Sequence, residues 1–294
     1  MKQLAALFCL LALASCTKKE TPPPPPPAPV KTVTFALKQP AAGTKHVDLS
    51  SYQSDVSLTA QAGDQTQRSV MTSRASSLFT VEYLEVEGDT VKKARITYGD
   101  KKSVDLDDGK GDENISPVAN KTYLLEAEAD DDDDELEVTV RTADGKEAPA
   151  SEADVVRDDA DFIGKPDQFR SAFPRRALTV GEAVPELVKA VQDLVTDGAT
   201  RDDGSDAPRI SDVRVTLAED RGEVAVFSTT MTMDNSDEKM TTVMKLAGTL
   251  EVRKADTQLL LVDLKGPVTL ASQANDVKVE GSGKMAISIA RKFQ

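Results

Sequence analysis

The sequence predicts a mainly β protein, built as a curved antiparallel sheet or half-open β-barrel with a long C-terminal meander and a short helical segment packed on it. Segments rich in Val, Thr and Ile alternate apolar and polar residues with a period of two, as half-buried strands do. Short turns separate these segments. Only residues 151–198 place apolar side chains at helical spacing. Two separate β domains joined by helices are the alternative.

Composition and charge exclude several classes of function. The 294 residues carry a formal net charge of -14, which repels nucleic-acid phosphates and excludes nucleic acid as a partner. Because His46 is the one histidine, a site that needs two imidazole ligands is excluded as well. Aromatic residues make up only 4% of the chain and Trp is absent, so we expect a core of Val, Leu, Ala and Ile.

Residues 1–15 are predicted to be a signal peptide. Lys2 precedes an apolar to weakly polar run from Leu4 to Ala14. As a helix, this run of about 11 residues would span only about 16 Å, against roughly 30 Å for the bilayer core. The run is therefore too short for a permanent transmembrane anchor.

The end of this leader, Leu13-Ala14-Ser15-Cys16, resembles the lipobox of bacterial lipoproteins. The resemblance implies that Cys16 receives a diacylglyceryl group, that cleavage follows Ser15, and that the new amino group is acylated. The covalent lipid is then the only cofactor expected. Since Cys9 is lost with the leader, the mature chain would have no disulfide. An ordinary secretory signal that happens to precede a cysteine is the alternative.

Lipidation at Cys16 predicts a chain held at the cell envelope by its acyl groups, because two or three chains give stable membrane attachment. Thr17 stands where lipoproteins kept at the inner membrane of enteric bacteria carry Asp, so the resemblance favours the outer membrane. Residues 16–30 then form a tether. The run from Pro22 to Pro27 favours an extended polyproline II helix, which could hold the folded part roughly 40 Å from the bilayer. A protease-resistant linker without a length requirement is the alternative.

The folded part is expected to comprise an N-terminal β region (31–150), a helical segment (151–198) and the C-terminal meander (199–294). Period-2 alternation predicts the N-terminal strands at 32–37, 55–61, 79–86, 90–97, 123–128 and 136–141. The same pattern predicts longer C-terminal strands at 213–218, 223–233, 240–253, 258–271 and 277–291. Long neighbouring strands accumulate twist, so we expect them to curl into a trough.

The helical segment is predicted to contain two helices. Ser151, followed by Asp154 three residues later, indicates a capping box at the start of a short helix. A second helix begins at Pro185 and ends at Gly198. Its apolar side chains fall on one stripe, which we expect to cover the concave face of the sheet: Val184, Leu187, Val188, Val191, Leu194 and Val195. At the level of fold alone, this arrangement resembles the half-open β-barrels with a helical lid found in envelope lipoprotein carriers.

Two features suggest metal ligands but are better explained otherwise. The acidic run from Asp130 to Asp134 and the cluster from Asp105 to Glu113 lack the spacing of a calcium loop, so we interpret both as solvated loops and predict no metal site. Four methionines lie at even spacing around one turn, and we interpret them as core residues rather than Cu(I) ligands: Met231, Met233, Met240 and Met244.

Residues 161–176 are the best candidate for contact with a partner. This segment concentrates aromatic and basic residues within an acidic chain, a mixture typical of interface hot spots. We expect the cations to face solvent, where they would attract an anionic group of an envelope protein or of the cell wall. The alternative is that the three aromatic rings only dock the segment to the core. The candidate residues are Phe162, Lys165, Phe169, Arg170, Phe173, Arg175 and Arg176.

The sequence favours a non-enzymatic binding or structural module over two other classes. No nucleophile elbow, phosphate loop or Cys-His pair occurs, and His46 is expected on an exposed loop. A carrier of an apolar ligand such as a lipid is the first alternative, and a hydrolase with paired carboxylates is the second. Tight packing of Leu187, Val191 and Leu194 on the strands would favour the module, whereas an apolar cavity of a few hundred cubic ångströms would favour the carrier.

Overall fold

One antiparallel sheet dominates the computed structural model of the protein. The model describes residues 31–294 except for 130–135, 198–207, 237–239 and 275–276, so the predicted signal peptide, Cys16 and tether lie outside the described residues. The sheet has 11 strands in the order β7-β6-β4-β3-β2-β13-β12-β11-β10-β9, and β5 pairs with β4 beside this path. The mainly β fold with an antiparallel sheet is therefore confirmed. The sheet is not closed, since β7 and β9 lie at its two edges.

The strands of the N-terminal half begin with two long ones that continue well beyond the predicted segments. They are β2 (Lys45–Ala62), β3 (Gln65–Glu87), β4 (Thr90–Asp107), β5 (Glu113–Ile115), β6 (Thr122–Ala129) and β7 (Leu136–Thr142). Those of the C-terminal half match the predicted meander closely. They are β9 (Arg209–Arg221), β10 (Val224–Asp234), β11 (Met240–Arg253), β12 (Gln258–Ala274) and β13 (Val277–Phe293).

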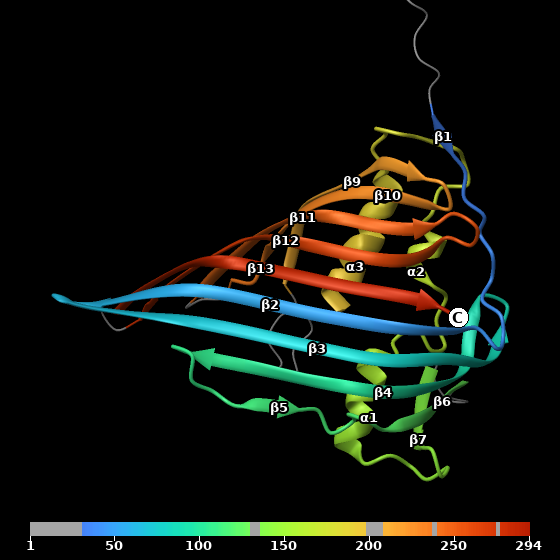
Figure 1. The fold of residues 1–294 in the computed structure, drawn as a ribbon, viewed down its shortest axis with the longest axis horizontal. Helices are drawn as coiled ribbons and strands as arrows, with labels where there is room; N and C mark the ends of the chain where they lie inside the picture. The colour runs from blue at the N-terminus through green and yellow to red at the C-terminus, as the bar shows by residue number, and fades with distance from the viewer. Residues whose placement is uncertain (1–30, 130–135, 198–207, 237–239, 275–276) are drawn as a thin grey trace, which may run out of the picture. The chain divides into compact units, whose positions relative to one another are not determined.

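The two halves join through β2 and β13, which lie side by side at the centre of Figure 1. Their antiparallel register runs without interruption from Val277 opposite Ala62 to Phe293 opposite His46. The predicted N-terminal β region and C-terminal meander are thus parts of one sheet. Two separate β domains, the alternative from the sequence, are not observed.

Three glycines on adjacent strands permit the close approach that curls the sheet. They are Gly248 on β11, Gly266 on β12 and Gly283 on β13. A Cβ atom at any of them would collide with a backbone carbonyl of the neighbouring strand, and at Gly266 that group is the carbonyl of Lys245. Strand positions where only glycine fits are typical of bends in strongly curved sheets.

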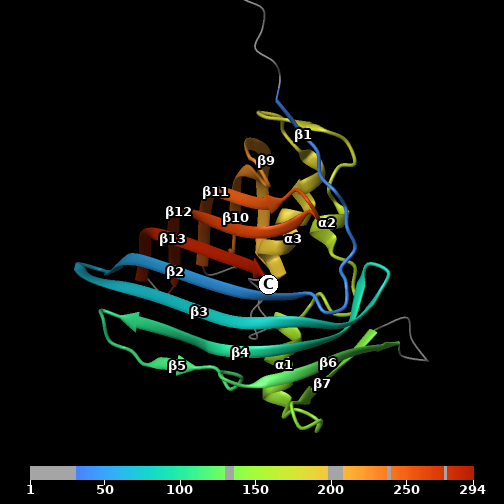
Figure 2. The same cartoon turned by 45° about the vertical axis from the view of Figure 1, so that its right-hand side comes forward.

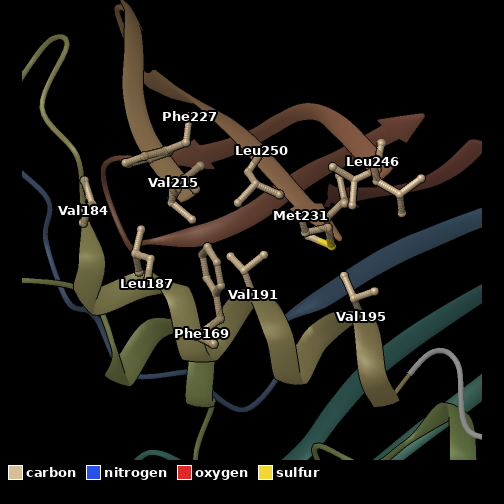
Figure 3. Packing of buried hydrophobic residues seen from close by; sticks show 14 of the residues in the cluster. Phe169, Val184, Leu187, Val191, Val195, Val215, Phe227, Met231, Leu246 and Leu250 are labelled. Carbon is tan, nitrogen blue, oxygen red and sulfur yellow. The ribbon is translucent and has the colours of Figure 1, made fainter. Parts of the chain in front are cut away.

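The helices divide the buried residues into two clusters on the inner face of the sheet. The helices are α1 (Ala150–Asp159), α2 (Gln168–Ser171) and α3 (Val188–Asp197), and a 3-10 turn, η1 (Pro185–Leu187), precedes α3. In the first cluster, Leu187 and Val191 pack on side chains of β9, β10 and β11, as Figure 3 shows. In the second, side chains of α1 pack with those of β3, β4, β6 and β7. The apolar stripe of the second predicted helix is thereby confirmed as the contact with the sheet, except that Val188 is partly exposed and lies outside the cluster.

The N-terminal segment of the described chain runs along the end of the first cluster (Figure 2). Within it, β1 (Thr32–Val33) pairs with β8 (Leu178–Thr179) in a separate two-stranded sheet, so the strand predicted at 32–37 is shorter than expected. The ring of Phe35 lies 4.8 Å from that of Phe173. Thr257 then donates a hydrogen bond of 2.7 Å to the carbonyl of Ala36. These contacts hold residues 32–36 against the rest of the fold.

Two local predictions from the sequence are wrong. The capping box does not form, because α1 begins at Ala150 with Pro149 at its N-cap and no side-chain cap, so that Ser151 lies inside the helix. Proline has no backbone N–H and ends the preceding segment, which places the boundary before the serine. His46 is buried in β2 rather than exposed on a loop, because β3 and β13 flank it on both sides.

Candidate functional site

A cavity of about 640 Å³ lies on the inner face of the sheet, between the strands and the chain that connects α1 to α2. On the sheet side, Tyr83 and Val91 come from β3 and β4, and Ile289 and Arg291 come from β13. On the helix side lie residues of the connecting chain and Leu194 of α3. Sites for small molecules typically have volumes of about 300–1,000 Å³, so this cavity is large enough for one.

Backbone contacts hold the connecting chain against the start of β4. The N–H of Ile163 donates to the carbonyl of Ala160 at 3.0 Å, and the N–H of Gly164 donates to the carbonyl of Val91 at 2.9 Å. Gly164 has φ of 75°, a conformation that glycine adopts without strain. Asp167 then caps α2 by accepting a hydrogen bond of 2.9 Å from the N–H of Arg170. The segment that we predicted as a partner surface is therefore a wall of the cavity.

The aromatic residues of this segment pack inward. Phe169 and Phe173 are buried in the first cluster, and the Phe173 ring lies 5.8 Å from that of Phe227. Phe162 packs against the second cluster, with its ring 5.9 Å from that of Tyr83. All three rings therefore match the alternative from the sequence, in which they dock the segment to the core. Only Phe162 and Phe169 also line the cavity.

The basic residues of the segment divide into a buried and an exposed group. Arg170 is only 5% exposed and donates hydrogen bonds to the carbonyls of Lys38 and Asp89, so the expectation that it faces solvent is wrong. A guanidinium without water needs such acceptors, and two distant parts of the chain converge on it to supply them. Arg176 is exposed and pairs with Glu182 and Glu186.

Lys165 and Arg175 are exposed, and the described residues offer them no ion pair. Lys165 lies at the rim of the cavity, whereas Arg175 lies away from it. Contact of this segment with an envelope partner stays a prediction, now limited to the exposed cations Lys165, Arg175 and Arg176.

An ion pair between a partly exposed guanidinium and a buried carboxylate forms one end of the cavity, and the sequence did not indicate it. Arg291 donates from Nε and Nη2 to the two carboxylate oxygens of Asp48 at 2.8 and 2.7 Å. Burial by itself would lower the pKa of Arg291, but the hydrogen bonds and charge of Asp48 raise it above its ordinary value. Arg291 and Asp48 are 243 positions apart in the chain and meet only because β2 and β13 pair, so no local pattern could reveal them.

His46 and Tyr83 lie beside this pair. The His46 ring is 5.5 Å from the Tyr83 ring and 5.3 Å from the Phe293 ring, and its Nε2 lies 3.6 Å from Asp48. Burial is the main cause that lowers the pKa of His46 to about 4, Arg291 lowers it further, and Asp48 opposes both. The imidazole is therefore neutral at pH 7. Burial likewise raises the pKa of Tyr83, so its hydroxyl stays protonated.

The carboxylates near α1 have structural partners. Asp159 accepts hydrogen bonds from the Tyr98 hydroxyl at 2.9 Å and from the Lys101 ammonium at 2.5 Å. Glu152 accepts one of 2.5 Å from the Tyr123 hydroxyl. Burial is the largest cause that raises the pKa of both tyrosines. These bonds anchor α1 to β4 and β6.

The features considered as metal ligands have other roles where the structure describes them. Met231, Met233 and Met244 are buried in the first cluster, as the core interpretation predicts, while Met240 is partly exposed. In the second acidic cluster, Asp108 accepts a hydrogen bond from the N–H of Val70. The run of aspartates at 130–134 lies outside the described residues. Over the part of the chain that is described, no three His, Cys, Asp or Glu side chains are grouped so that they could hold a metal ion.

Comparison with known proteins gives little guidance. No family model matches the chain, and no curated protein does. Among solved structures, the chain is similar to Ail, the attachment invasion locus protein of Yersinia pestis, in complex with the heparin analogue sucrose octasulfate. The sequences are 8% identical over 86% of this chain and 100% of that chain, and the TM-score of 0.12 is too low to carry an argument. None of the helices in the described ranges combines the length and the apolar character needed to cross a membrane.

Proposed function

We propose that this protein is a lipid-anchored lipoprotein of the cell envelope, and that its β-rich part is a binding module which takes an apolar or amphiphilic ligand into the cavity beneath α1, α2 and α3. The lipobox-like Leu13-Ala14-Ser15-Cys16 supports the anchor and a position at the outer membrane. The cavity supports the binding role, and it is the observation on which the proposal depends.

The packing of α3 on the sheet distinguishes a ligand-binding module from a purely structural one. Leu187 and Val191 are fully buried against the strands, so no ligand space exists beneath this part of the helix. One turn further along, Leu194 is only partly buried and lines the cavity. Together with Val91, Ile163 and Ile289 it presents apolar surface to a cavity that is partly open to solvent and also lined by charged residues. Apolar surface beside polar groups suits an amphiphilic ligand.

Mass spectrometry of organic extracts from the natively purified protein tests the proposal. We expect one stoichiometric apolar or amphiphilic compound per chain. Leu194→Trp narrows the cavity and should reduce the amount recovered. Lys189→Trp, on the exposed face of the same helix, is the control and should leave it unchanged. Extracts that never contain a stoichiometric compound would leave the structural module as the better description.

A carrier that passes its ligand to an acceptor is the second candidate. The observation that favours it is that the cavity is partly open to solvent, with the exposed Lys165 among its lining residues. A carrier would transfer its bound compound to acceptor vesicles within minutes. A static binding module would retain the compound in the same assay.

A further inference from the structure

We infer that the cavity selects a ligand whose polar group is uncharged and accepts hydrogen bonds, such as the ester of an acyl glycerol, and that this group lies against Tyr83 and Arg291. The inference deepens the proposed function and rests on it. Two features of the cavity support it. They are the hydrogen-bond donors that face the cavity and the balance of the charges near them.

The Tyr83 hydroxyl is one available donor. The side chain lines the cavity and is only 8% exposed, with its ring between those of His46 and Phe162. Within the described part of the chain, no hydrogen bond reaches its hydroxyl. The hydroxyl opens onto the cavity, where an oxygen atom of a ligand can replace water as its hydrogen-bond acceptor.

The Arg291 guanidinium is the second donor. Asp48 occupies Nε and Nη2, and the hydrogen bonds among the described residues leave Nη1 without an acceptor. The side chain retains 29% of its exposure and lines the cavity. Nη1 and the Tyr83 hydroxyl together offer donors to a carbonyl oxygen, which has two lone pairs to receive them.

The charges at this end of the cavity balance without a ligand. Asp48 neutralises Arg291, and the carboxylate of Asp167 lies at the start of α2 beside Arg170. A carboxylate or phosphate would therefore add an uncompensated negative charge to a poorly hydrated site in a chain of net charge -14. An ammonium group would likewise add an uncompensated positive charge, and it cannot accept the hydrogen bonds that Tyr83 and Arg291 offer. An uncharged acceptor meets neither penalty.

Other charges along the cavity further disfavour an anionic ligand. Asp89 and Asp193 also line the cavity and would repel an anionic ligand, although Lys189 pairs with the latter. Lys165 is the exposed cation of the rim, and solvent screens it. Arg157 is occupied by Asp154 and by the carbonyl of Val138. The apolar tail of the ligand would lie along Ile289 and Leu194.

A single tryptophan can report binding, because the chain contains none. The full chain with Cys16→Ala, which removes the predicted acylation site, and Phe162→Trp in the cavity wall is titrated with three compounds that share a 12-carbon tail. They are 1-monolauroylglycerol, dodecanoate and dodecylammonium. We expect the uncharged ester to bind at least tenfold more tightly than either ion. Equal or tighter binding of dodecanoate would overturn the inference.

Tyr83→Phe tests the hydrogen bond while keeping the ring. It should weaken binding of 1-monolauroylglycerol about fivefold to tenfold and change binding of dodecanoate by less than twofold. Tyr123→Phe is the matched control, since it removes a hydroxyl from the same sheet that is bonded to Glu152, and neither residue lines the cavity. It should leave the affinity unchanged. If Tyr83→Phe and Tyr123→Phe bind the ester as tightly as the parent, Tyr83 does not hold the ligand and the inference fails.

The titration separates the inference from the proposed function. If all three compounds bind with equal affinity, the proposed cavity for apolar tails is supported, but the selection of an uncharged group is contradicted. Binding of none of them would contradict both. Arg291→Lys serves as a second variant. It keeps the charge opposite Asp48 but cannot donate to both Asp48 and a ligand in the same geometry, so it should lower the affinity for the ester while the protein remains folded.

Discussion

Arg170 donates a hydrogen bond from Nη1 to the carbonyl oxygen of Lys38 at 3.0 Å, although the two residues are 132 positions apart in the chain. Its Nη2 donates to the carbonyl of Asp89 at 3.3 Å. One buried side chain thus joins the one-turn helix α2 to the N-terminal segment and to the turn between β3 and β4. Because Pro40 and Asp89 also line the cavity, this junction sets the position of one cavity wall.

Arg170→Glu should destabilise the protein strongly. The variant would bury a carboxylate opposite two carbonyl oxygens, and an uncompensated buried charge typically costs about 3–5 kcal/mol. Urea unfolding measures the change in the free energy of unfolding. Arg175→Glu, five positions along and exposed, is the control and should leave that free energy nearly unchanged. If both variants unfold at the urea concentration of the parent, Arg170 does not hold the wall.

Gly266→Ala should be poorly tolerated. The new methyl group would collide with the carbonyl of Lys245 on β11, so the two strands would have to separate. We expect a loss of about 2 kcal/mol or more in the free energy of unfolding, in the range of strained strand positions. In Gly99→Ala, the methyl group would meet only the flexible Leu78 side chain at 3.1 Å. If Gly99→Ala lowers the free energy of unfolding as much, the lost backbone flexibility of glycine, and not a collision with the neighbouring strand, explains both losses.

His46 should make stability depend on pH between about 4 and 6.5. Its pKa is 6.5 in the unfolded chain and about 4 in the folded protein, so the unfolded state binds more protons in this window. Stability is therefore complete above pH 6.5 and falls as the pH decreases toward 4, by on the order of 3 kcal/mol in total. Urea unfolding at pH 7 and pH 5 should show a smaller difference for His46→Leu than for the parent. An identical pH dependence in both would contradict burial of a neutral imidazole.

Leu187→Ala should cost about 2–5 kcal/mol in the free energy of unfolding, because the side chain is fully buried between η1 and the sheet. Leu194→Ala should cost less, since that side chain is partly exposed to the cavity. The two variants also differ in binding. Only Leu194→Ala should change the affinity for an apolar tail, as measured by the fluorescence titration described above. If Leu194→Ala lowers the free energy of unfolding more than Leu187→Ala does, the cavity does not lie beside Leu194.

Lipid anchoring is tested by the intact mass of the protein purified from membranes. We expect the loss of residues 1–15 and the addition of acyl groups at Cys16. Cys16→Ala should block processing or release the protein from the membrane fraction, because the protein without acyl groups has no stable attachment to the membrane. An unmodified mature chain in the soluble fraction would rule out the anchor.

The sequence was informative where alternation reflects one buried face. The strand predicted at 240–253 has the observed bounds of β11, in which Met244, Leu246 and Leu250 face the core. The first part of β3 was missed because residues 65–77 are mostly Ser, Thr and Arg and face solvent on both sides, so the strand exists through pairing with β2 rather than through its own pattern. β2 begins ten positions earlier than predicted, because the buried side chains of its first part, His46 and Asp48, are polar and give no apolar alternation.

The candidate site shows the same limit. Residues 161–176 were recognised from their aromatic and basic composition, and they do form a wall of the cavity. Their role was misjudged because the contacts that bury Arg170 come from Lys38 and Asp89, more than eighty positions away. Tyr83 and Arg291, which form the polar end, carry no local signal at all. A site assembled from β3 and β13 depends on the register of the sheet, which composition does not reveal.

The pairing of β2 with β13 also constrains the order of folding. β2 starts at Lys45, and its partner is the last strand of the described chain, ending at Phe293. During synthesis, one edge of β2 therefore has no partner until β13 has been made. Unpaired strand edges are prone to intermolecular association, and contacts of such long sequence separation form slowly. Any truncation that removes β13 should leave the N-terminal half with an open, aggregation-prone edge rather than with a smaller stable sheet.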